Sequence, residues 1–218
     1  LVELMVAMVL SLVLLGGVIQ IYASNKASYR VHEAVTQAQE NGRFAAEILA
    51  RDIRMADYWG CAYNIGLVTN NLDRGNPADP PPAGYVDFGA GGINGTEGGA
   101  NPDSLVLRGG YDAGLDVQAP YGPQASSNLQ VAAGNGLQED DIVLVSDCTS
   151  ADIFQVVNAN PGTSGTLVHN TGTGTPGNYN ANNPGCPGGG NAHCLSKVYG
   201  EDATVFKVQE ISYTIANG

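Results

Sequence analysis

Residues 1–22 read LVELMVAMVLSLVLLGGVIQIY, an apolar run that a single charged residue, Glu3, interrupts. About 20 helical residues, each rising roughly 1.5 Å, cover the ~30 Å hydrocarbon core of a bilayer. The run is therefore long enough to span a membrane as one helix. We divide the chain into a hydrophobic helix at 1–25, an amphipathic continuation at 26–60 and a globular head at 61–218.

The helical pattern continues past the apolar run. From Tyr22 to about Tyr58 the chain has no proline, and apolar side chains recur at steps of three and four residues, the period of one helix face. The residues of this stripe are Ala27, Val31, Ala34, Val35, Ala38, Gly42, Ala45, Ile48, Leu49 and Ile53. We expect one long helix that ends near Gly60.

Three stretches carry a family resemblance. The opening segment LVELMVAMVLSLVLLGG is similar to the amino-terminal segment of mature type IV pilins and pseudopilins, the prepilin family that is cleaved and methylated at its N terminus. QENGRFAAEILARDIRMADYWGC, residues 39–61, and DDIVLVSDCTSADIFQV, residues 140–156, resemble PilW-type minor pilins. From the resemblance we expect a leader and two mature residues before Leu1, and further strands after ISYTIANG.

The resemblance implies an α+β, type IV pilin-like fold, with a long N-terminal helix packed on an antiparallel sheet in a head with long Gly/Asn-rich loops. It implies a structural subunit of an extracellular type IV pilus or similar filament of a Gram-negative type of bacterium. The expected partners are copies of the chain or other pilins, the inner membrane before assembly, the pilus assembly machinery and the prepilin peptidase. A type II secretion pseudopilin is the alternative within this field. From another class, the alternative is a membrane-anchored surface adhesin or binding module that does not polymerise.

Glu3 is the first candidate functional residue of the helix. A carboxylate within lipid costs several kcal/mol unless it is paired or protonated. The resemblance implies that Glu3 pairs with the amino terminus of an adjacent subunit and guides assembly. The alternative is a side chain that extends to the lipid headgroups.

Gly16 and Gly17 are the second candidate feature. Each glycine in a helix interior lowers helix stability by about 1 kcal/mol relative to alanine. The resemblance implies that this segment unwinds when the subunit moves from the membrane to the filament. A notch of small residues for close packing between helices is the equal alternative.

The composition is that of one hydrophobic core with a loop-rich head, since 43% of the 218 residues are hydrophobic and 30 are glycine. The formal net charge is −12, and it is unevenly distributed. The chain has five basic and six acidic residues up to Cys61, but four basic and fifteen acidic residues in the remainder. Because nucleic-acid binding depends on clustered Lys and Arg, we expect no direct binding to DNA or RNA.

The four cysteines are Cys61, Cys148, Cys186 and Cys194, an even number that indicates an oxidising compartment and two disulfides. Three pairings are possible. Cys186 and Cys194 bracket the short segment PGGGNAH, which can close on itself, and this favours a second bridge between Cys61 and Cys148. The rival interpretation is a metal site made of Cys186, His193 and Cys194. That site lacks a CxxC spacing and an evident fourth ligand, so we expect no metal.

The expected strands of the head are Ser104–Arg108, Asp141–Ser146, Ile153–Val157, Gly165–His169, Lys197–Tyr199 and Val205–Ala216. In the last of these, Phe206 and Val208 fall on one face but Ile211 and Tyr213 on the other. We therefore expect a bulge or break near Gln209. Residues 71–101 and 158–193 are rich in Gly, Pro, Asn and Thr, and we expect surface loops there.

No set of residues predicts catalysis or a cofactor. His32, His169 and His193 are scattered over the helix, a strand and a loop, and Ser146 has no base at a recognisable spacing. The acidic run Glu139, Asp140 and Asp141 lacks the EF-hand spacing of a calcium site, which favours a solvated turn. Asn94-Gly95-Thr96 matches the glycosylation sequon.

Overall fold

The computed structural model describes residues 1–75, 78–82, 85–88, 91–99, 102–121, 128–170, 174–178 and 195–214. The chain divides into two compact units, Leu1–Arg51 and Asp52–Gly218. The first unit is helical, and the second contains the last turn of the same helix and all of the strands. The fold class is α+β, as the sequence predicts.

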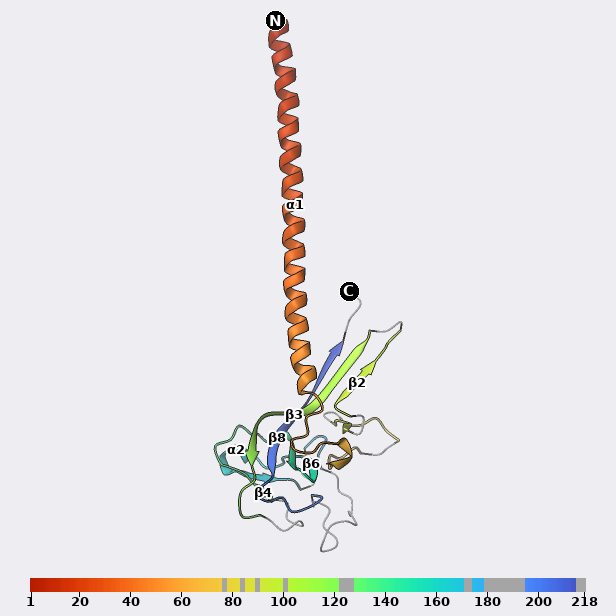
Figure 1. Ribbon diagram of the computed structural model, residues 1–218, viewed down its shortest axis with the longest axis vertical. Helices are drawn as coiled ribbons and strands as arrows, with labels where there is room; N and C mark the ends of the chain where they lie inside the picture. Colours follow the sequence, from red (N-terminus) through yellow and green to blue (C-terminus); the bar gives the residue numbers. More distant parts are fainter. Residues whose placement is uncertain are drawn as a thin grey trace. The chain divides into compact units, whose positions relative to one another are not determined.

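The helix α1 spans Val2–Met55 (Figure 1). It runs without a break through Gly16 and Gly17, and no proline interrupts it. It ends at Met55, before the expected end near Gly60. The reason is that Asp57 adopts a left-handed φ of 63° and its backbone N–H donates a 2.8 Å hydrogen bond to the carbonyl of Arg108 on a strand.

The second unit is built on a mixed six-stranded sheet in the order β1-β6-β5-β8-β3-β2, with a separate pair β4-β7. A short 3-10 helix, η1, precedes β1, and a four-residue helix, α2, precedes β7. The elements are η1 Ile65–Leu67, β1 Val68–Asn70, β2 Ile93–Thr96, β3 Ser104–Asp116, β4 Asn128–Gln130, β5 Ile142–Asp147, β6 Ser150–Gln155, α2 Pro161–Ser164, β7 Thr166–Val168 and β8 Thr204–Thr214.

One pair of strands departs from the antiparallel sheet that we expected. β1 and β6 are parallel, with Val68 opposite Ala151, whereas all the other pairs are antiparallel. A disulfide between Cys61 and Cys148 joins the segments that precede these two strands.

Strand positions agree with the sequence best where apolar runs are longest. β5, β6, β7 and β8 lie at the expected segments, and β3 extends to Asp116, well past Arg108. Lys197–Tyr199 is not a strand, and β2 lies within 71–101, where we expected only loops. Phe88 and Leu72, from the same expected loop region, are buried core residues.

The expected bulge near Gln209 is absent, because Gly109 pairs with Gln209 in a continuous register from Tyr111 to Ser104. The irregularity lies instead in β3, between Tyr111 and Leu115. Near its start β8 contacts core residues on both faces of the sheet, whereas Ile211 and Tyr213, further along, are only partly buried. Val205 belongs to one core cluster, while Phe206 packs against the other.

The two core clusters lie on opposite faces of the sheet. Along β5, Val143 and Val145 belong to one cluster and Leu144 to the other, as the alternation of side chains in a strand requires. The first cluster includes Phe154, Leu167 and Tyr199, and the second includes Trp59, Phe88 and Ile153. Because Trp59 follows the end of the helix closely, its packing in the second cluster anchors the helix end to the sheet.

Candidate functional site

The first candidate site is the surface of α1. No residue of α1 is buried, and apolar side chains such as Leu4, Leu12 and Ile19 are 58–71% exposed. Within the described part of the chain α1 is the one helix long and apolar enough to cross a membrane, with a mean hydropathy of 2.5 over 18 residues. By length and composition, this helix is suited to anchor the chain in a membrane.

Glu3 and the two glycines lie on this surface. Glu3 is in the first turn of α1 and is exposed. Among the described residues, a Cβ added at Gly16 or at Gly17 would meet no atom within 4 Å apart from the neighbouring backbone of α1 itself. The structure does not bring these three residues together, and each is exposed on the surface of the helix.

The second feature is the junction that follows α1, where Asp57 links the helix end to β2 and β3. Its Oδ1 accepts hydrogen bonds from Trp59 Nε1 at 2.7 Å and from the backbone N–H of Gly92 at 3.0 Å. The backbone N–H of Gly110 donates to the carbonyl of Tyr58 at 2.7 Å. The indole of Trp59 packs edge-on against Phe88, with ring centroids 5.5 Å apart. The end of α1 is thus held by specific polar contacts as well as by apolar packing.

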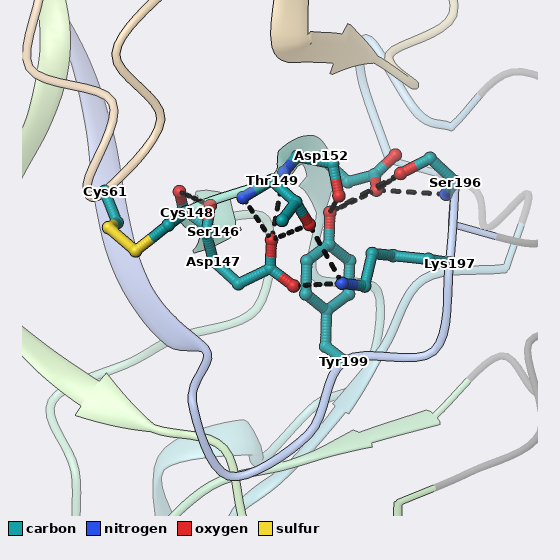
Figure 2. Close-up of polar contacts among 10 residues, drawn as sticks. Cys61, Ser146, Asp147, Cys148, Thr149, Asp152, Ser196, Lys197 and Tyr199 are labelled. Carbon is teal, nitrogen blue, oxygen red and sulfur yellow. Dashed lines mark hydrogen bonds and ion pairs between the residues drawn. A yellow bond between two sulfur atoms is a disulfide. The ribbon is translucent and has the colours of Figure 1, made fainter.

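The disulfide lies close to this junction. Cys61 and Cys148 are bonded across 87 residues of sequence, with their Cα atoms 4.5 Å apart (Figure 2). This is the connectivity that the sequence favours. Cys186, Cys194 and His193 lie outside the described residues.

A buried polar cluster surrounds the turn from β5 to β6, and Figure 2 shows its side chains directed at one another. The carboxylate of Asp147, 1% exposed, binds Lys197 Nζ and accepts hydrogen bonds from the backbone N–H of Thr149 and Ser150 at 2.8 and 2.9 Å. The hydroxyl of Thr149 donates a further bond at 2.7 Å. Burial by itself raises the pKa of Asp147, but the hydrogen bonds from Lys197, Thr149 and Ser150 outweigh it and lower the pKa to about 2.

Asp152 is the second buried carboxylate of the cluster, with no exposed surface. It accepts hydrogen bonds from the hydroxyl of Tyr199 at 2.6 Å, the backbone N–H of Ser196 at 3.0 Å and the side-chain amide of Asn71 at 2.8 Å. Burial and the charge of Asp152 raise the pKa of Tyr199, so the phenol stays protonated as a donor. The two carboxylates together fasten residues 195–199 to the β5–β6 hairpin.

This cluster is a structural fastening, and the sequence reveals it only in part. The segment D-C-T-S, residues 147–150, has the pattern of an Asx turn, in which an aspartate caps its own following N–H groups. Lys197 and Tyr199 lie about fifty residues away in sequence, and no local pattern connects them with Asp147 or Asp152. Their side chains complete the cluster from a segment that is not a strand.

The other candidate residues lie apart. Ser146 Oγ donates to the carbonyl of Asp147, while the His169 ring packs against Phe154 with centroids 5.1 Å apart. Asp141 forms an ion pair with Lys207 at 2.7 Å, and its neighbour Asp140 has a left-handed φ of 69°. No group of three metal-binding side chains occurs among the described residues. Asn94, the sequon residue, is exposed on β2.

Comparisons with protein-family models, with curated proteins and with solved structures give no match for this chain.

Proposed function

We propose that the chain is a structural subunit of an extracellular filament of the type IV pilus kind, related in role to PilW-type minor pilins. The helix α1 holds the subunit in the inner membrane before assembly, and the same helix packs against copies of itself or other pilins in the fibre. The observation that carries the proposal is the exposed apolar surface of α1, which continues beyond the thickness of a bilayer.

The length of this surface favours polymerisation over simple anchoring. The 54 residues of α1 extend about 80 Å, whereas a bilayer with its headgroups is about 40–45 Å thick. Val31, Val35 and Phe44 lie beyond the hydrophobic run and are still 61%, 49% and 67% exposed. Lipid covers the first part of the helix only, whereas neighbouring helices of the same kind cover both parts. This favours a helical bundle of subunits over an isolated anchor.

Energetics support the same assembly. Covering a large aliphatic side chain contributes about 1.5–3 kcal/mol when it leaves water. Between helices in lipid, close packing and hydrogen bonds drive association instead. Glu3 makes the free energy of assembly depend on the height at which a subunit docks. An ionised carboxylate in hydrocarbon costs several kcal/mol, and a neighbouring amino terminus removes that cost. A subunit that docks at the correct height is therefore favoured over one that docks elsewhere.

The first test replaces Glu3 by alanine in the full chain, expressed in a bacterium that assembles filaments. Glu40→Ala is the matched control, since it removes the same charge from an exposed position further along α1. We expect E3A to abolish the chain's recovery in sheared filaments while the membrane fraction retains it, and E40A to assemble. Wild-type filament yields from E3A would contradict the role of Glu3.

The second test separates the kinds of subunit. Mass spectrometry of sheared surface filaments counts this chain against every other pilin-like protein. Dominance identifies the bulk subunit, and a trace level identifies a minor, tip or priming subunit. Complete absence from filaments, with a monomer in detergent, would replace the proposal by the anchored binding module.

A further inference from the structure

Two basic and two aromatic side chains lie together on one stretch of α1, directly after its apolar run. Between Leu1 and Asn25 the only charged side chain is Glu3, and Lys26 and Arg30 are the first cationic side chains of the chain. Tyr22 and Tyr29 flank Lys26 and are 68% and 72% exposed. Lys26 and Arg30 are also exposed, and neither forms an ion pair with a residue that the structure describes.

Helix geometry places these four side chains on one face. At about 100° per residue, Tyr22, Lys26, Tyr29 and Arg30 fall within an arc of roughly 100°. Along the axis the group extends about 12 Å from Tyr22 to Arg30. Glu33 falls in the same arc but lies about 4–5 Å further from the apolar run than Arg30.

The position of this group along the helix matches the polar layer of a bilayer. The helical residues from Val2 to Ile21 rise about 30 Å, which is the thickness of the hydrocarbon core. With these residues in the core, Tyr22 lies at its boundary, Lys26 about 6 Å beyond it and Arg30 about 12 Å beyond it. Tyrosine is enriched at that boundary, and the long stems of Lys and Arg let their charges reach the phosphates.

We infer that Tyr22, Lys26, Tyr29 and Arg30 form a binding site for the headgroup of an anionic phospholipid, which fixes the depth of α1 in the membrane. The inference rests on the membrane-inserted stage of the proposed function. Charge complementarity selects the occupant: two unpaired cations attract a phosphate that carries a net negative charge, and a zwitterionic headgroup offers less. The remainder of the chain, four bases against fifteen acids after Cys61, supplies no comparable attraction to an anionic surface.

The experiment measures lipid selectivity with the full chain reconstituted in membranes of phosphatidylcholine and phosphatidylglycerol. Spin-labelled phosphatidylglycerol and spin-labelled phosphatidylcholine are compared by electron paramagnetic resonance, which reports the lipid held at the protein surface. The test variant is Lys26→Gln/Arg30→Gln. The matched control is Arg43→Gln/Arg54→Gln, which makes the same change in net charge on α1 but further from the apolar run than a Debye length of about 8–10 Å. Helical content and the fluorescence of Trp59, the single tryptophan, check that all variants are folded.

We expect the wild-type chain to prefer phosphatidylglycerol over phosphatidylcholine about fivefold or more. A preference of about fivefold is what roughly one basic residue near an anionic membrane surface provides. The preference should fall in high salt, disappear in K26Q/R30Q and persist in R43Q/R54Q. No preference in the wild type, or an equal loss in both double variants, would overturn the lipid site while leaving the filament proposal intact. If no lipid of either kind is restricted at the protein surface, the helix does not enter the bilayer and the membrane stage fails as well.

Discussion

Gly92 lies so close to Asp57 that a Cβ on the glycine would be 2.3 Å from the Cα of the aspartate. The same glycine donates its N–H to the Asp57 carboxylate at 3.0 Å. The turn that ends α1 therefore requires a glycine at position 92, just before β2. Asp57 and Gly92, which are 35 residues apart in sequence, are thus in close backbone contact.

The first prediction is that Gly92→Ala destabilises the second unit. The added methyl group meets backbone atoms that cannot rotate away, and overpacking of this kind costs about 1–3 kcal/mol. Gly95→Ala on β2 is the control, because the nearest atom to its Cβ would be 3.9 Å away. Denaturant unfolding of the full chain in detergent, followed by Trp59 fluorescence, measures both. Equal midpoints for the two variants would show that the junction relaxes freely.

The second prediction concerns acid. The pKa of Asp147 is lowered from 3.8 to about 2 in the folded chain, so its contribution is complete above the unfolded pKa and is lost as pH falls from about 4 to 2. The contribution is about 2 kcal/mol. Asp147→Asn should therefore be less stable than wild type at pH 7 but lose less stability on acidification. The exposed Asp202→Asn is the control, and an unchanged acid profile for D147N would contradict the assigned partners of Asp147.

The third prediction concerns the disulfide between Cys61 and Cys148. A bridge that closes a loop of this length stabilises the fold by about 4–5 kcal/mol in the chain-entropy model. Cys61→Ser/Cys148→Ser should lower the unfolding free energy by an amount of this order, and the single replacements should be at least as unstable. The serine variants confine the change to these two cysteines without a reductant. A double variant as stable as the wild type would mean that the polar cluster alone holds the segment.

The fourth prediction concerns Gly16 and Gly17. A Cβ at either glycine would meet no described atom within 4 Å outside the neighbouring helix backbone, and alanine favours a helix by about 1 kcal/mol at each position. If this segment unwinds on assembly, as the resemblance to pilins implies, Gly16→Ala/Gly17→Ala should leave membrane insertion and helical content unchanged or higher but reduce filament yield. Circular dichroism in detergent and sheared-filament yield test this. Normal yield with alanine but none with Gly16→Leu/Gly17→Leu would favour the packing notch instead.

Sequence patterns predict the parts of this fold that depend on long, local signals. The apolar run and the absence of proline predict α1, and the apolar runs from residues 142 and 205 predict β5 and β8. The strands β1, β2 and β4 have only three or four residues each, too few for a periodic pattern. The β2 sequence INGT even contains Asn-Gly, a strong turn signal, yet pairing with β3 overrides it.

The candidate sites divide in the same way. Glu3, Gly16 and Gly17 are recognisable because they are exceptions within a uniform apolar helix. The cluster of the buried Asp147, Asp152 and Tyr199 with the half-exposed Lys197 depends on which distant segments the fold brings together. Only the tertiary structure supplies that information, and the direction of β1 beside β6 depends on it as well.

The disulfide has a consequence for a chain that a protease has cut. Any cut by a protease between residues 62 and 147 divides the polypeptide into two pieces, yet the bond between Cys61 and Cys148 keeps them covalently joined. A chain nicked in that interval therefore keeps its N-terminal helix covalently attached to the piece that carries β6 and β8. On a non-reducing gel it migrates as one species, and the damage becomes visible only when the sulfur bridge is opened.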